Sequence, residues 1–175
     1  AAAGASPTDQ LVKQREYVYR AAGCHGCHTD EKHAGKPLAG GHALATPFGT
    51  FYTPNITPDP ETGIGRWSEQ DFIRALREGQ SPAGDHYYPS FPYPSYTKLT
   101  DEDLHALWAY LKAQPPVKQA NRKHELKWFA RARSFVGSWK GLYFTPGAYR
   151  PDATKPAVWN RGAYLAEAAA HCGEC

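Results

Sequence analysis

The stretch Cys24-His25-Gly26-Cys27-His28 has the pattern Cys-x-x-Cys-His. On a helix, positions three apart lie on one face, so the thiols of Cys24 and Cys27 can reach the two vinyl groups of one porphyrin. His28 follows in the same turn and can place a ring nitrogen on the iron. This pattern is the attachment signature of c-type haem, and we expect one covalent haem at these three residues.

All four cysteines fall in two Cys-x-x-Cys pairs, and the second pair, Cys172 and Cys175, closes the chain. The two pairs lie near opposite ends of the sequence, far beyond the roughly 15–20 residues that separate the pairs of a zinc ribbon. A redox dithiol at Cys24 would need a βαβ pattern around it, and none is present. We therefore favour haem attachment over a zinc or dithiol site.

Size and composition narrow the class of protein. The 175 residues suffice for one domain, or for one domain and part of another. No apolar run approaches the roughly 20 residues of a transmembrane helix. A formal charge of +3 gives no reason to expect a nucleic-acid partner.

The periodicity of the chain predicts helices and long loops. We expect a helix over 8–23 that ends just before the haem motif, and a long loop over 29–66 that is rich in Gly, Pro and Thr. A second helix is expected over 69–77, a loop rich in Pro and Tyr over 80–99, and a third helix from 101 to 114. No segment shows the alternation of a strand, so the fold class is all-α.

Capping residues support the two later helices. Ser68 is placed as an N-cap with Asp71 three residues on, and Thr100 is placed as the cap of the next helix. Pro115 stops that helix. The expected buried faces are Phe72, Ile73 and Leu76 in the first of these helices, and Leu104, Leu107, Trp108 and Leu111 in the second.

Residues 115–158 differ from what precedes them, because basic and aromatic side chains alternate there. One interpretation is a basic amphipathic helix that lies on a membrane or docks a partner. The other, which we favour, is a connector whose aromatic side chains pack on haem domains. The residues are Lys118, Arg122, Lys123, Lys127, Arg131, Arg133 and Lys140, and Trp128, Phe129, Phe135, Trp139, Tyr143 and Phe144.

The first pattern restarts at residue 159. Tyr164 precedes the second cysteine pair much as Tyr17 precedes the first. This is an internal repeat. We therefore divide the chain into a haem domain over 8–114, a basic aromatic connector over 115–158, and the start of a second haem domain over 159–175.

These features, taken with several further stretches, resemble a known family over almost the whole chain. The resemblance is to the N-terminal half and connector of the multihaem cytochrome c subunits of periplasmic dehydrogenases. Those subunits serve membrane-bound alcohol, aldehyde and gluconate dehydrogenases and some molybdenum hydroxylases. The matching stretches are Thr46-Pro47-Phe48-Gly49-Thr50, Asn55-Ile56-Thr57-Pro58-Asp59, Gly63-Ile64-Gly65-Arg66-Trp67-Ser68, Tyr88-Pro89-Ser90-Phe91-Pro92-Tyr93 and Trp159-Asn160-Arg161-Gly162-Ala163-Tyr164.

The resemblance implies a small class I-like cytochrome c domain with long loops around its haem. It also implies that Cys172 and Cys175 attach a second haem c in a longer chain. The implied function is electron transfer without catalysis, from a dehydrogenase catalytic subunit to quinone or another cytochrome. Covalent haem attachment and the small residues of 1–6 fit a periplasmic protein, and peripheral membrane contact remains open.

The far side of the haem is the open question, because the chain contains 0 Met. In many members of the family a Met binds iron at the position of Phe91. His86 is our candidate for the sixth iron ligand, because a neutral imidazole suits iron and the residue lies in the same loop. The alternatives are an open or water-ligated iron, a tyrosine, or a distant histidine such as His42 or His33.

Side chains around the ring are also expected. We place Tyr52, Trp67 and Trp108 beside the porphyrin, and Arg66 against a propionate.

A haem enzyme or small-ligand sensor with an open distal site is the alternative function. A module that binds membranes through the basic aromatic segment is a third hypothesis.

Overall fold

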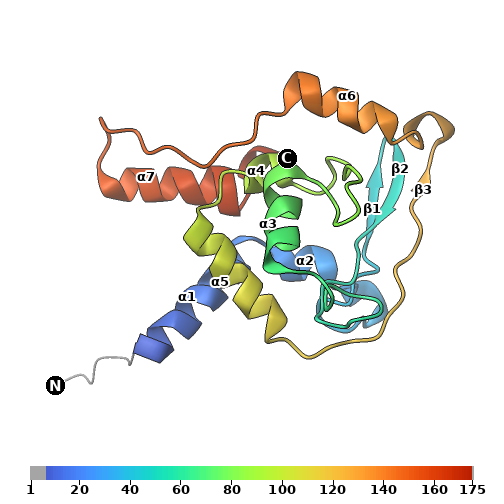
Figure 1. The fold of residues 1–175 in the computed structure, drawn as a ribbon, viewed down its shortest axis with the longest axis horizontal. Coiled ribbons are helices and arrows are strands. Elements are labelled where there is room, and N and C mark those ends of the chain that lie inside the picture. The colour runs from blue at the N-terminus through green and yellow to red at the C-terminus, as the bar shows by residue number, and fades with distance from the viewer. Residues whose placement is uncertain (1–6, 175) are drawn as a thin grey trace.

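The computed structural model describes the backbone of residues 7–174 and the side chains of 12–174. Helices surround a small core, and a three-stranded sheet lies at one end (Figure 1). The helices are α1 (Pro7–Ala21), α2 (Cys24–His28), α3 (Glu69–Glu78), α4 (Tyr93–Tyr96), α5 (Asp101–Lys112), α6 (Ser134–Tyr143) and α7 (Ala157–Tyr164). The shorter turns are η1 (Glu31–His33), η2 (Trp128–Ala130), η3 (Leu165–Ala169), which is a π-helix, and η4 (Cys172–Glu174).

The sheet corrects the expectation of an all-α fold. Strands β1 (Ala43–Thr46) and β2 (Gly49–Tyr52) form an antiparallel hairpin inside the segment expected to be loop, and β3 (Glu125–Leu126) pairs with β2. Strands of two to four residues are too short to show an alternating pattern. The third strand comes from the connector, so only the folded chain brings the sheet together.

The helices that the capping residues predicted are present. Ser68 accepts a hydrogen bond from the Asp71 backbone N–H at 3.1 Å, and the Asp71 carboxylate accepts one from the Ser68 backbone N–H in return. Helix α3 ends at Gly79, which adopts a φ of 59°. A Cβ there would lie 2.6 Å from the ring of Tyr93, so glycine also lets α4 approach.

The core lies between α1, α3 and α5. Tyr19 of α1 stacks on Tyr110 of α5, with ring centroids 4.3 Å apart. Ile73 and Trp108 are only half-buried, although the sequence placed both on buried faces. The buried core residues include Val18, Ala22, Leu38, Ile64, Phe72, Leu76, Leu99, Leu104, Leu107 and Leu111.

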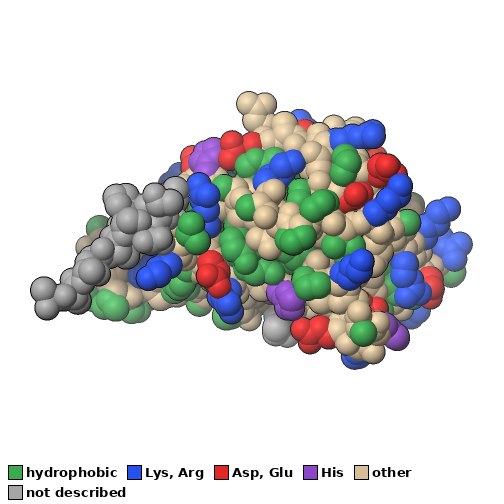
Figure 2. Space-filling model, turned by 90° about the horizontal axis from the view of Figure 1, so that it is seen from below, with side chains coloured by type: hydrophobic (Ala, Val, Ile, Leu, Met, Phe, Trp, Pro, Cys, Tyr) green, Lys and Arg blue, Asp and Glu red, His purple; other side chains and the backbone are tan. Residues whose placement is uncertain are grey.

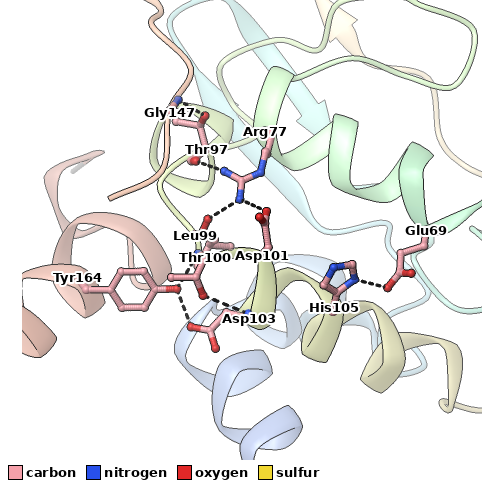
Figure 3. A network of polar contacts seen from close by, with 10 residues as sticks. All are labelled: Glu69, Arg77, Thr97, Leu99, Thr100, Asp101, Asp103, His105, Gly147 and Tyr164. Atoms are coloured by element: carbon pink, nitrogen blue, oxygen red, sulfur yellow. Dashed lines mark hydrogen bonds and ion pairs between the residues drawn. The ribbon is translucent and has the colours of Figure 1, made fainter. Parts of the chain in front are cut away.

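A polar network fixes the end of the 80–99 segment (Figure 3). Arg77 donates hydrogen bonds to the carbonyl oxygens of Thr97 and Leu99, both at 2.9 Å, and pairs with Asp101 at 2.5 Å. Thr97 accepts a hydrogen bond from the backbone N–H of Gly147. The network therefore joins α3, the start of α5 and the connector.

The segment after helix α6 packs against the core through three buried side chains, those of Tyr164, Ala168 and Ala169. Tyr164 is 4% exposed, and its hydroxyl donates to the Asp103 carboxylate at 2.6 Å (Figure 3). Ala168 and Ala169 are buried in the same hydrophobic cluster. These three residues, from the segment predicted to begin a second domain, thus share one apolar cluster with residues of 8–114.

Candidate haem site

Helix α2 presents the first cysteine pair. Gly23 precedes it with a φ of 66°, and this left-handed residue turns the chain from α1 into α2. Cys24 is half-buried and Cys27 is exposed, and neither forms a disulfide. Burial raises the pKa of Cys24 to about 12 and also raises the pKa of Cys27. A redox dithiol needs the opposite shift, so the site does not favour the dithiol alternative.

His28 is held in the tautomer that iron requires. Its Nδ1 lies 2.8 Å from the carbonyl oxygen of Pro54. A carbonyl only accepts, so Nδ1 carries the proton and Nε2 keeps its lone pair for a metal. Burial lowers the pKa of the imidazole, and the hydrogen bond to Pro54 opposes this shift. Pro54 is a positioning residue that nothing in the sequence singled out.

Half-buried apolar side chains surround the motif and pack against the core. Phe91 lies among tyrosines, with ring centroids 5.7 Å from Tyr87 and 5.8 Å from Tyr96. Tyr96 donates to the carbonyl oxygen of Ala22 at 2.6 Å. Tyr96 therefore connects the segment that carries Phe91 to the residues just before Cys24, which the sequence did not predict.

His86, the predicted sixth iron ligand, contacts the connector helix α6. Its Nδ1 is 3.1 Å from the ammonium of Lys140, which can only donate, so the proton of the neutral ring is on Nε2. A protonated Nε2 has no lone pair for iron. The ring also packs on α6, where a Cβ at Gly137 would lie 3.3 Å from Nε2. The connector helix therefore holds this histidine in the structure, and the assignment of His86 as the sixth iron ligand stays a prediction.

Lys140 belongs to the same contact. It is 8% exposed, and its ammonium donates to the carbonyl oxygens of Glu78 and Gly79 at the end of α3. The negative end of the helix dipole favours a cation there. Burial lowers the pKa of Lys140. The connector is thus attached to the haem domain by a buried basic residue.

The other residues that the sequence predicted beside the haem have the following surroundings in the structure. Tyr52 is buried, its hydroxyl donates to Glu125 at 3.1 Å, and the Arg122 guanidinium lies 3.8 Å from its ring centre. Trp67 is half-buried against the core and Arg66 is exposed. Trp108 packs on Phe72, with ring centroids 5.3 Å apart.

Four other histidines have different surroundings in the structure. His42 lies near His28, where its charge lowers the pKa of that residue. His33 is exposed and pairs with Asp30 at 2.8 Å. His105 pairs with Glu69 on the surface (Figure 3). His124 accepts a hydrogen bond from the Tyr52 backbone N–H at 3.1 Å.

The second cysteine pair begins beside the first site. His171 adopts a φ of 41°, and its ring lies 5.6 Å from that of Tyr96. Ser95 donates to Glu174 at 2.6 Å. Cys172 is exposed, and Cys175 lies outside the described residues.

The donor set fits a covalently attached haem. Two thiols and one imidazole with a free Nε2 lie on a single turn, and half-buried Ile56, Trp67 and Phe91 belong to the surrounding apolar cluster. Among residues 12–174, no three His, Cys, Asp or Glu side chains converge on a point where they could bind a bare metal ion. The two thiols, the free Nε2 and the apolar surroundings therefore suit a porphyrin.

Comparison with known proteins agrees with this geometry. The family model described as Cytochrome c matches residues 16–115. The chain is 46% identical over 165 residues to a nicotinate dehydrogenase subunit of Pseudomonas putida, covering 94% of this chain and 14% of that protein. It is 45% identical over 170 residues to the gluconate 2-dehydrogenase cytochrome c subunit of Pantoea cypripedii. That match covers 95% of this chain and 38% of the relative.

A third relative is the diheme cytochrome c-type protein of Cereibacter sphaeroides, which is 42% identical over 163 residues, covering 91% of this chain and 55% of the relative. The chain thus spans between about one seventh and about half of the length of these relatives. The family match covers more than half of the chain and includes α2 and the residues around it. The protein described here belongs to the cytochrome c family.

Proposed function

We propose that this chain is the electron-transfer part of a periplasmic dehydrogenase complex, with haem c bound at Cys24, Cys27 and His28. The observation that carries the proposal is the orientation of His28, whose Nδ1 donates to Pro54 and whose Nε2 is left for iron. When bound, haem c supplies a one-electron iron couple. The protein's part is to hold the group, set its potential and limit access of water.

The relatives support electron transfer over the alternative of a haem enzyme or ligand sensor. They carry the names of cytochrome subunits of gluconate, alcohol and fructose dehydrogenases. We propose a dehydrogenase catalytic subunit as electron donor, and quinone or another cytochrome as acceptor. We also propose peripheral contact with the membrane. Among the described residues, no helix combines the length and apolarity needed to cross a bilayer.

A second haem c at Cys172 and Cys175 is part of the proposal. A diheme relative and the repeated approach to each cysteine pair support it. We likewise propose that Phe91, Trp67 and Trp108 provide apolar contacts near the ring, with Tyr52 and Arg66 near its polar edge. The domain division proposed is a haem domain over 8–114, a connector over 115–158 and the opening of a second unit over 159–175.

The test is expression in a periplasm that matures c-type cytochromes, followed by a denaturing gel stained for haem and a pyridine haemochrome spectrum. The chain should retain haem on the gel and show the spectrum of two thioether bonds. In a background in which Cys172 and Cys175 are both replaced by Ser, Cys24→Ser should shift that spectrum to one thioether bond, and the Cys24→Ser, Cys27→Ser double variant should lose covalent haem. Haem that stays covalently bound in the double variant would refute the site.

A ligand test separates electron transfer from the alternative. Carbon monoxide is added to the reduced protein and the absorption spectrum is recorded. A six-coordinate, low-spin spectrum that does not change supports pure electron transfer. Prompt carbon monoxide binding would favour a ligand sensor or haem enzyme.

A further inference from the structure

Three aromatic side chains form an exposed cluster at the sheet end of the molecule. Phe48, Trp128 and Phe129 are 54%, 82% and 47% exposed. The Phe129 ring lies 6.4 Å from that of Phe48 and 5.7 Å from that of Trp128. We call these three residues the aromatic patch. Exposed large apolar side chains that adjoin one another mark an interaction surface.

The sheet holds the patch together. Gly49 of β2 pairs with Leu126 of β3, and the Lys127 backbone N–H donates to the Phe48 carbonyl oxygen at 2.9 Å. Phe48 occupies the tip of the β1–β2 hairpin, and Trp128 and Phe129 follow β3. Backbone hydrogen bonds therefore fix residues that are far apart in sequence on one protruding edge.

A cationic cavity lies beside the patch. Its volume is about 720 Å³, and its lining includes four basic residues and one acidic residue, which are Arg122, Lys123, Arg131, Arg133 and Glu125. Arg131 follows Phe129 by two residues, so the patch and the cavity adjoin. Lys and Arg side chains gather at the end of the molecule that carries β3 (Figure 2).

Few anionic groups of the protein neutralise this cavity. Arg122 and Arg133 pair with carboxylates only at 3.9 and 4.0 Å. Lys123 and Arg131 form no ion pair within the described chain. The single acidic residue between 115 and 140 is Glu125, against seven Lys or Arg residues. An anionic ligand would satisfy the remaining cations.

We propose that this edge binds an anionic phospholipid surface, with the aromatic patch in the interfacial layer and the cavity around phosphate-bearing headgroups. Trp and Phe side chains flanked by Lys and Arg are typical of such contacts. The basic side chains that lie beside the three exposed rings are complementary in charge to such a surface. This inference rests on the proposed membrane association. It adds that the aromatic patch and the cavity make the contact and that the lipid is an anionic phospholipid.

The experiment uses the haem-loaded chain and measures sedimentation with vesicles by protein staining of the pellet on a gel, so the readout does not depend on haem. Vesicles of phosphatidylcholine alone are compared with vesicles that also contain phosphatidylglycerol. We expect binding only to the anionic vesicles, weakened by salt. Trp128→Ser, Phe129→Ser should lower the partition coefficient at least about tenfold, and Lys123→Gln, Arg131→Gln should remove the preference for phosphatidylglycerol. Val158→Ser, at a site 79% exposed on α7, is the matched control and should have no effect.

Three results would overturn the inference. These are equal binding to both vesicles, no binding to either by a protein with a normal haem spectrum, and binding that the Trp128→Ser, Phe129→Ser variant leaves unchanged. In the last case, binding of the protein to polyaspartate as strongly as to anionic vesicles would indicate an acidic protein partner instead. A chain that binds anionic vesicles but lacks covalent haem would refute the proposed function and leave this inference standing.

Discussion

Gly23 and His171 occupy equivalent places, each directly before the first cysteine of a pair, and they lie against each other. Both adopt left-handed backbone conformations, with φ values of 66° and 41°. A Cβ on Gly23 would lie 3.8 Å from Nε2 of His171. The residues that precede the two cysteine pairs thus both have a positive φ and lie in contact.

Gly23→Ala should destabilise the protein by about 1 kcal/mol, because an L-residue pays roughly 1–2 kcal/mol for the left-handed region. The approach of His171 leaves room for one methyl group, so strain of the backbone rather than a clash sets the cost. Urea unfolding followed by circular dichroism measures it. Gly162→Ala, in helix α7 with no heavy atom within 4 Å, is the control and should be neutral or slightly stabilising. Equal effects at both sites would contradict this explanation.

His86→Ala should leave the haem absorption spectrum unchanged in both oxidation states. The reason is that Lys140 donates to Nδ1 of His86, which places the ring proton on Nε2. The Soret and charge-transfer regions of the spectrum report the ligands of the iron directly. A change to a high-spin spectrum in His86→Ala would identify this histidine as the sixth ligand.

Lys140→Met should lower the free energy of unfolding by about 1–3 kcal/mol, because the carbonyl oxygens at the end of α3 lose a buried donor. Methionine keeps most of the volume and removes the charge. Thermal or urea unfolding of the haem-loaded protein is the measurement. Lys36→Met, at an exposed lysine, serves as the control and should stay within about 0.5 kcal/mol of the parent. A similar loss in both variants would show that charge removal in general, and not this contact, is responsible.

Tyr164→Phe should cost about 1–3 kcal/mol of stability, because the buried Asp103 carboxylate loses the donor 2.6 Å away. The loss should appear as weaker docking of α7 on α5. Hydrogen exchange of the amides of α7 measures this locally. The exposed Tyr143, 73% accessible, provides the matched control as Tyr143→Phe. Unchanged exchange in α7 would contradict the assigned role of the contact.

Stability should also fall at alkaline pH. Burial, followed by the hydrogen bond to Asp103, raises the pKa of Tyr164 to about 12 from an ordinary value of 10.0. The folded state keeps the phenol protonated where the unfolded chain releases the proton, so its contribution is complete below pH 10 and is lost as the pH rises towards 12. Urea unfolding between pH 8 and pH 12 tests this. The Tyr164→Phe variant should lose less stability over that interval, and an equal loss would assign the effect to other groups.

Much of the fold could be predicted from local sequence. Ser68 with Asp71, Thr100 with its acidic neighbours, and Gly79 each act on the few residues around them, so the bounds of α3 and α5 follow closely from their caps. The sheet could not be predicted in this way. Its third strand has two residues and comes from the connector, and its pairing depends on contacts between distant segments.

The haem motif is likewise a local feature, since two thiols and an imidazole within five residues define what they can bind. The surroundings of that motif depend on tertiary contacts. The Pro54 carbonyl selects the tautomer of His28, and Lys140 fixes the opposite tautomer in His86. Imidazole has the same composition in both places, so only the partner that the fold supplies decides which nitrogen is available.

The sequence by itself therefore determined the family, from stretches spread along the chain. It also determined the haem-attachment pattern of Cys24, Cys27 and His28 and the principal helices, because these depend on spacing within a few residues. The tertiary structure alone decided that Tyr164, Ala168 and Ala169 join the core, that Gly23 meets His171, and that Phe48 packs on Phe129. These contacts connect residues far apart in the chain, and the burial of apolar side chains and the hydrogen bonds of the folded backbone bring them together.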